Sequence, residues 1–211
     1  SLGNGDYLIV SQPIEGYRTS RLAFGTSSAS PLSIGFWVKA NRTGTYSGSV
    51  KNSAANRSYP FSFTISASNT WEYKTITLNG DTSGTWLTNN GIGLRLTFTM
   101  ASGSTYLGTA DTWAGSDYIG VPGTTNGVAA TSDTFQLTGL VVLPGVEVPS
   151  ASKSTFILRS FDQELLLCQR YYEKTYPLTD VPGTAYGTIN GGGPLVSYSF
   201  ASNNWMNLST W

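Results

Sequence analysis

The strongest constraint on the fold is the alternation of hydrophobic and polar residues over short stretches. In Ile92–Met100, every second residue is hydrophobic, and the residues between are small, polar or charged. Arg57–Ala67 follows the same pattern, with Tyr, Phe, Phe and Ile on one face and Ser, Pro and Thr on the other. Because successive side chains of a strand point to opposite faces, this period of two predicts half-buried β-strands.

Similar stretches recur along the whole chain, separated by turns rich in Gly, Asn, Asp and Ser. The further predicted strands are Tyr7–Val10, Arg21–Gly25, Leu32–Ala40, Tyr46–Val50, Trp71–Leu78, Phe135–Leu143, Leu195–Phe200 and a last one around Trp205–Trp211. Many short strands joined by regular turns favour an all-β, antiparallel β-sandwich. Spacing alone does not separate a jelly roll from another Greek-key sandwich.

Two prolines limit where strands can run. Pro13 follows Tyr7–Val10 and is expected to interrupt that strand. Pro60 lies inside Arg57–Ala67. Since proline has no N–H to donate, the strand that contains Pro60 should have a free edge there or a bulge.

One stretch, Arg159–Tyr176, departs from the β pattern. Ser160 is followed three residues later by Gln163, which is the signature of a capping box, and Leu165–Leu167 then supply an apolar patch. The pattern predicts one short helix of about two turns, followed by extended structure. Cys168, the single cysteine, excludes an intrachain disulfide and is expected to be a small core residue.

Composition excludes several classes of function. The chain has 12 basic and 12 acidic residues, so only 11% of it is charged and its net charge is zero. A protein that binds nucleic acid needs clustered Lys and Arg, so nucleic acid is not an expected partner. No apolar run approaches the roughly 20 residues that cross a bilayer, so membrane insertion is not expected either.

The chain contains no histidine. Histidine is the commonest general base and metal ligand, and a Ser-His-Asp or Cys-His nucleophile cannot be built without it. A glycosidase would need two acids on opposite sides of a bond, and no spaced acidic cluster is present. We therefore expect a protein without enzymatic activity and without a cofactor.

The candidate binding residues lie in the long loop from about Ala101 to Ser132, because loops of more than about 15 residues are usually functional or disordered. Trp113 and Tyr118 offer flat rings, and Asp111 and Asp117 offer carboxylates nearby. Aromatic rings cover the apolar faces of sugars, so these four residues form the candidate carbohydrate site. The alternatives are that Trp113 folds back to close an open end of the sandwich, or that it contacts another subunit.

Calcium is not indicated, although the sequence leaves room for a structural ion. Ca²⁺ is bound by several loop oxygens. Asp111, Asp117 and Asp133 lie in predicted loops, but no EF-hand spacing is present.

Three ordered groups of residues resemble a domain found in phage tail-fibre and related virion proteins. The resemblance covers roughly Ile14 to Tyr176. The first group is Phe36-Trp37-Val38, Thr43 to Ser47, Asn52 and Arg57-Ser58-Tyr59; the second is Trp71, Tyr73, Thr75 and Gly80 to Trp86; the third is Leu143, Gly145, Phe156 and the run from Glu164 to Lys174.

This resemblance implies a jelly roll like those of carbohydrate-binding modules. It also implies a virion location, in a tail fibre or another surface appendage, and a homotrimer that contacts other virion proteins. The leading hypothesis is a receptor-binding domain that recognises host surface polysaccharide, with neutral ligands preferred. The alternatives are a structural virion domain, such as a capsid decoration, collar or fibre connector, and a polysaccharide depolymerase.

The predicted domain organisation is a sandwich over residues 1–176 and a β extension over residues 177–211. The extension belongs either to the same sandwich or to a subunit contact. The sequence begins and ends in what reads as β structure, so further segments are expected at both ends.

Overall fold

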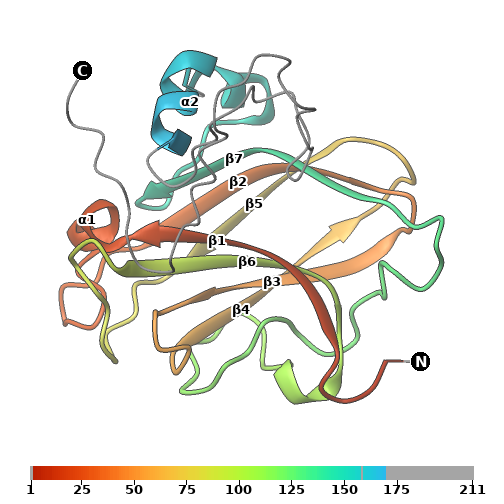
Figure 1. Ribbon diagram of the computed structural model, residues 1–211, viewed down its shortest axis with the longest axis horizontal. Coiled ribbons are helices and arrows are strands. Elements are labelled where there is room, and N and C mark those ends of the chain that lie inside the picture. The colour runs from red at the N-terminus through yellow and green to blue at the C-terminus, as the bar shows by residue number, and fades with distance from the viewer. Residues whose placement is uncertain (1, 158, 170–211) are drawn as a thin grey trace, which may run out of the picture. The chain divides into compact units, whose positions relative to one another are not determined.

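A computed structural model of the chain describes residues 2–157 and 159–169 (Figure 1). The chain divides into two compact units, Ser1–Arg159 and Ser160–Trp211, and the β-strands among the described residues lie in the first. The boundary predicted at residue 176, the extension over 177–211 and the two predicted strands within it lie outside the described residues.

The first unit is an antiparallel sandwich of two sheets. One sheet has the strand order β1 (Tyr7–Glu15), β6 (Ile92–Ser102), β3 (Gly44–Lys51) and β4 (Ser58–Ile65), and the other has the order β5 (Glu72–Leu78), β2 (Leu32–Ala40) and β7 (Phe135–Pro144). Between the described strands, every connection except the β3–β4 hairpin passes from one sheet to the other. The predicted all-β, antiparallel β-sandwich is confirmed, and this connectivity is the one expected of a jelly roll.

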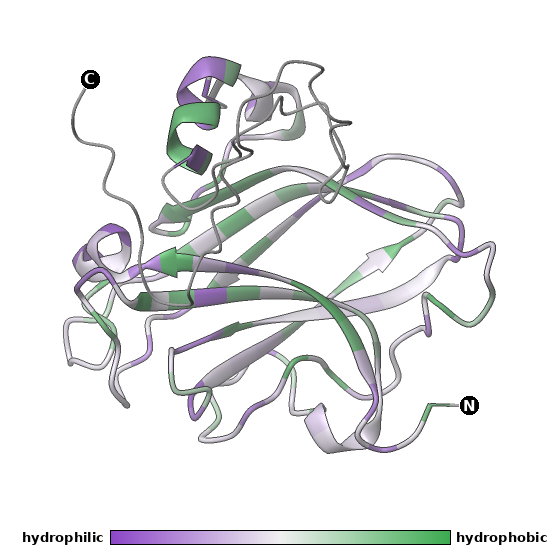
Figure 2. Ribbon diagram, in the orientation of Figure 1, coloured by the Kyte–Doolittle hydropathy of each residue, from purple (hydrophilic) through white to green (hydrophobic). Residues whose placement is uncertain are grey.

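The core lies between the two sheets, where the alternating hydrophobic residues meet. Figure 2 shows this alternation along β2 and β6. Phe36 of β2 contacts Phe63 of β4 and Phe98 of β6, with ring centroids 5.1 and 4.9 Å apart. The four β2 side chains predicted to point inward are all buried: Leu32, Ile34, Phe36 and Val38. Burial of each such side chain stabilises the folded chain by about 1.5–3 kcal/mol. The arrangement that turns the alternating hydrophobic residues inward is therefore strongly favoured.

Both prolines lie on edge strands. Pro60 is in β4, an edge strand whose one strand partner among the described strands is β3. The expected free edge is only partly present, because the Asp111 N–H donates to the Pro60 carbonyl at 2.8 Å and Ser58 bridges to Ala114. Pro13 does not interrupt its strand as expected: β1 continues through it to Glu15. Because β1 pairs only with β6, its outer side needs no hydrogen-bond donor, and an edge strand accepts proline.

The prediction of a strand at Arg21–Gly25 is wrong, because the chain there forms helical turns. A one-turn helix, α1 (Gly16–Thr19), leads into a 3-10 helix, Ser20–Leu22, and Ala23 then has a φ of 53°. Leu22 and Phe24 are both buried, so two alternate hydrophobic residues enter the core from a turn rather than from a strand. Over so few residues, a period of two does not distinguish these geometries.

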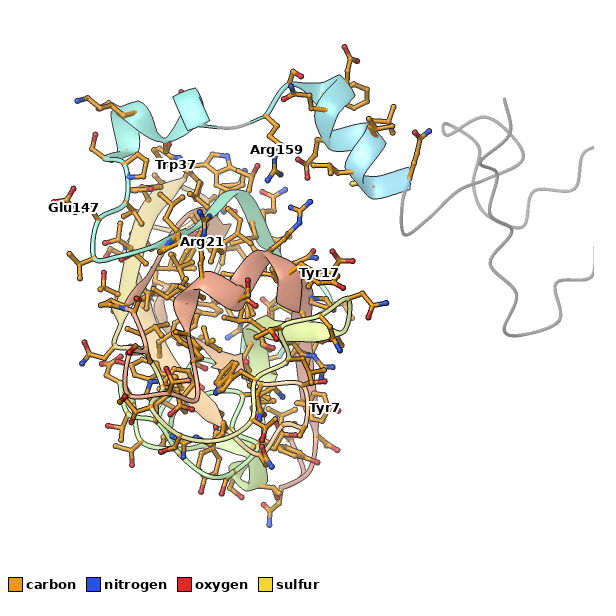
Figure 3. All side chains as sticks on the ribbon, turned by 90° about the vertical axis from the view of Figure 1, so that its left-hand side faces the viewer. Tyr7, Tyr17, Arg21, Trp37, Glu147 and Arg159 are labelled. Atoms are coloured by element: carbon orange, nitrogen blue, oxygen red, sulfur yellow. The ribbon has the colours of Figure 1, made fainter. Side chains whose placement is uncertain are left out.

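The outer face of the three-stranded sheet is covered by the chain that follows β7. Trp37, expected on this face, donates its indole N–H to Ser154 Oγ at 3.1 Å. The Tyr73 hydroxyl donates to the Pro149 carbonyl at 2.9 Å. Figure 3 shows Trp37 beneath this segment, which includes the 3-10 helix Ala151–Ile157. Trp37 is therefore a packing residue within its own chain.

The predicted helix is present as α2 (Phe161–Gln169). Cys168 is exposed, so the expectation that it is a core residue is wrong. The apolar run is only one turn long, and it does not enclose the thiol. Within the part of the chain that the structure describes, no helix has the length and apolar character needed to cross a membrane.

Candidate functional site

The long loop that follows β6 is held against the outer face of the four-stranded sheet. Ala114 and Ser58 exchange backbone hydrogen bonds, and the Ser58 hydroxyl donates to the Ser116 carbonyl at 2.6 Å. Thr99 Oγ1 donates to the Ile119 carbonyl at 2.5 Å. These bonds fix the loop as one wall of a depression whose floor is the sheet.

This depression, the β1–β6 groove, has a volume of about 340 Å³. That value lies at the lower end of the ~300–1,000 Å³ range of small-molecule sites. The groove is lined by residues of three strands and of the long loop: Tyr7, Ile9, Ser11, Pro13, Lys51, Arg95, Tyr106, Asp117 and Ile119.

Two tyrosines stand together in the groove. Tyr7 and Tyr106 meet edge to face, with centroids 5.1 Å apart and planes at 82°. Tyr7 is 51% exposed, so much of its surface faces solvent. Tyr106 ends a 3-10 turn that is held on both sides, by Thr105 N–H donating to the Asn4 carbonyl and by Ile119 N–H donating to the Tyr106 carbonyl. The pair is therefore a supported aromatic surface open to a ligand.

Charged side chains occupy another part of the groove. Lys51 of β3 and Arg95 of β6 are directly opposite each other in the antiparallel register. The Lys51 ammonium, whose side chain is only 5% exposed, lies 2.5 Å from Asp117 Oδ1. Arg95 is half-buried, and within the described part of the chain its guanidinium forms no hydrogen bond or ion pair.

The remainder of the lining combines hydroxyl and apolar groups. Ser11 Oγ lies 3.3 Å from Thr97 Oγ1, on the face that also carries Arg95. Ile9, Pro13 and Ile119 are the apolar members of the lining. The groove thus offers ring stacking, hydroxyl hydrogen bonds and cationic donors within one depression.

Trp113 lies elsewhere, in an aromatic cluster with Phe24, Tyr59 and Trp86. Its ring centroid is 5.8, 5.2 and 5.5 Å from theirs, in that order. Its indole N–H donates to the Asn79 carbonyl at 2.8 Å. Trp113 is half-buried and packs against the core. These contacts match the alternative in which Trp113 closes an end of the sandwich, and its role in sugar binding stays a prediction.

The other three predicted site residues are not gathered around Trp113. Asp111 is exposed with a φ of 57°, and its charge adds to the effect of burial in raising the pKa of Tyr59. Tyr118 is half-buried and its ring lies against Gly108. Of the four candidates, only Asp117 is among the residues that line the groove.

The sequence interpretation missed Tyr7, Tyr106, Lys51 and Arg95. A usable signal was present for Arg95, because it is the one charged residue among the polar positions of Ile92–Met100. A charge on the outer face of a central strand requires a partner or solvent nearby. The other three residues share no sequence signal with Arg95. Strand pairing brings Tyr7 and Lys51 to this face, and Tyr106 reaches it from a 3-10 turn.

The loop carboxylates considered for calcium are separated in the structure. Asp133 Oδ2 pairs with Arg42 Nε at 2.7 Å, while Asp117 pairs with Lys51. Backbone and side-chain donors, first among them the Ala130 N–H, lower the pKa of Asp133. Among the residues placed by the structure, no three His, Cys, Asp or Glu side chains gather as a metal site would require.

Comparison with known proteins finds no matching family model, no matching curated protein and no matching solved structure. The likeness to phage tail-fibre domains therefore rests on the sequence motifs alone.

Proposed function

We propose that the chain is a non-enzymatic carbohydrate-binding domain of a phage virion, of the tail-fibre type, and that host surface saccharide binds in the β1–β6 groove. The observation that carries this proposal is the supported tyrosine pair in a depression that also holds hydroxyl and charged groups. The tail-fibre assignment rests on the resemblance described above.

Sugars suit such a groove for two reasons. The C–H faces of a pyranose ring are apolar, and a flat phenol ring covers them at little cost in conformational entropy. The sugar hydroxyls need hydrogen-bond partners, which Ser11 and Asp117 supply. The side chain of Asp117 is 43% exposed, so it can accept a ligand hydrogen bond while it remains paired with Lys51.

The groove supports binding better than catalysis. Asp117 is the one carboxylate among its described lining residues, and Lys51 already neutralises it. Glycoside hydrolysis needs a second acid across the scissile bond, so a depolymerase is the weaker proposal. A purely structural virion domain would use its exposed aromatic residues in subunit contacts, so substitution of the exposed Tyr7 tests the two proposals against each other.

Weak binding at one site is compatible with this function. A millimolar site contributes only about −4 kcal/mol. We propose that the domain acts as a homotrimer within the virion, because several linked copies raise the effective affinity without any new contact.

We expect Tyr7→Ala and Tyr106→Ala each to weaken saccharide binding at least tenfold, about 1.4 kcal/mol, because each removes part of the aromatic surface. The measurement is an array of bacterial surface polysaccharides, followed by titration of each bound polysaccharide, with the mass in solution determined in parallel.

Tyr17→Ala is the matched control, because Tyr17 is 63% exposed and does not line the groove. It should bind as the wild type does. Loss of binding in Trp113→Ala but not in the groove variants would place the site in the aromatic cluster instead. No binding by the folded wild type would favour the structural virion domain.

A further inference from the structure

The paired cations in the groove point to the charge of its ligand. Lys51 and Arg95 face each other across β3 and β6, and both line the groove. Like charges directly opposite in a sheet destabilise it. Such a pair persists where nearby negative charge compensates for it.

That compensation is incomplete in the chain itself. Asp117 is bound to Lys51 at 2.5 Å and neutralises one of the two cations. Arg95 is half-buried and forms no ion pair or hydrogen bond within residues 2–157 and 159–169. With two cations and one carboxylate among its lining residues, the groove carries one net positive charge in a chain whose net charge is zero.

We infer that the groove selects an acidic saccharide, and that Arg95 is the residue that determines this specificity by binding a sugar carboxylate. A guanidinium presents parallel N–H donors that match the two oxygens of a carboxylate. Partial burial of Arg95 strengthens this bond by lowering the local dielectric constant. This inference rests on the proposed saccharide binding and adds the class of ligand.

The length of the groove indicates an oligosaccharide. Tyr7 and Pro13, both in the lining, are six residues apart on β1, which is roughly 20 Å of strand. Arg95 is the register partner of Pro13. The tyrosine pair and Arg95 thus lie toward opposite ends, so a ligand that reaches both has more than one ring, with a carboxylate near Arg95.

This inference reverses an expectation from composition. The low charge content predicts neutral ligands, but composition averages over the whole surface. The register of β3 with β6 places two of the 12 basic residues directly opposite each other.

The test compares every polysaccharide that binds on the array with its carboxyl-reduced form, in which each uronic acid has become a neutral sugar. Wild type should bind the native form at least about tenfold more tightly than the reduced form, as expected for a charge-assisted hydrogen bond. Arg95→Gln should remove this preference. Arg21→Gln, the matched control on an exposed residue outside the groove, should retain it.

Three outcomes would overturn the inference, and they separate it from the proposed function. If the reduced forms bind as well as the native forms, and Tyr7→Ala still abolishes binding, the groove binds sugars but does not select a carboxylate. If sodium acetate competes as strongly as the polysaccharide does, Arg95 binds a bare anion. If no polysaccharide binds the folded protein, both the proposed function and the inference fail.

Discussion

Phe36→Ala is expected to lower the free energy of unfolding by about 3–5 kcal/mol. The Phe36 side chain is fully buried and joins the two sheets through edge-to-face contacts with Phe63 and Phe98. Its removal loses the transfer free energy of a large apolar group and leaves a cavity between rigid sheets. Chemical denaturation of the variant and the wild type measures the difference.

Tyr17→Ala serves as the control for this substitution, because Tyr17 is 63% exposed and should cost little. If Phe36→Ala fails to fold, Phe36→Leu keeps most of the volume and should cost less than Phe36→Ala. Equal effects of Phe36→Ala and Tyr17→Ala would contradict the packing described here.

Arg57→Ala is expected to lower the free energy of unfolding by about 3 kcal/mol, because it leaves a buried carboxylate without its cationic partner. Arg57 donates two hydrogen bonds to Asp81, at 2.8 and 2.6 Å, and the side chain of Asp81 is only 2% exposed. The hydrogen bond to Asp81 raises the pKa of the Arg57 guanidinium, so the guanidinium stays charged. Ser83 N–H also donates to Asp81, at 3.1 Å, and partly stabilises the lone carboxylate.

The double variant Arg57→Met with Asp81→Asn tests the stated reason for this loss. It removes both charges, so it should be more stable than Arg57→Ala. Arg18→Ala, at an exposed arginine in α1, controls for loss of the residue type. A double variant less stable than Arg57→Ala would show that the unpaired carboxylate is not the cause of the stability loss in Arg57→Ala.

The sequence predicted those strands whose burial follows directly from local alternation. Leu32–Ala40 was predicted with the bounds of β2, and Ile92–Met100 lies within β6. The prediction failed at Arg21–Gly25, where Leu22 and Phe24 reach the core from a 3-10 turn. The predicted first strand was also too short, because Pro13 was expected to interrupt it. An edge strand accepts proline, and whether a strand lies at an edge depends on the strand order, which the local sequence does not show.

The candidate groove depends on information that no local pattern carries. Lys51 and Arg95 are 44 residues apart, and only the register of β3 with β6 places them opposite each other. Asp117 was predicted as a site residue from its loop, and the structure places it in the groove through its bond to Lys51. Trp113 was the most prominent aromatic residue in the sequence, but ring type alone does not reveal its contacts with Phe24, Tyr59 and Trp86.

The central claim is that saccharide binds in the β1–β6 groove. The most direct measurement is the change in backbone amide chemical shifts of ¹⁵N-labelled protein on titration with a polysaccharide fragment that binds on the array. The account predicts shifts concentrated at groove residues such as Ser11, Arg95, Tyr106 and Asp117. Shifts confined to Trp86 and Trp113, with the groove amides unchanged, would contradict it.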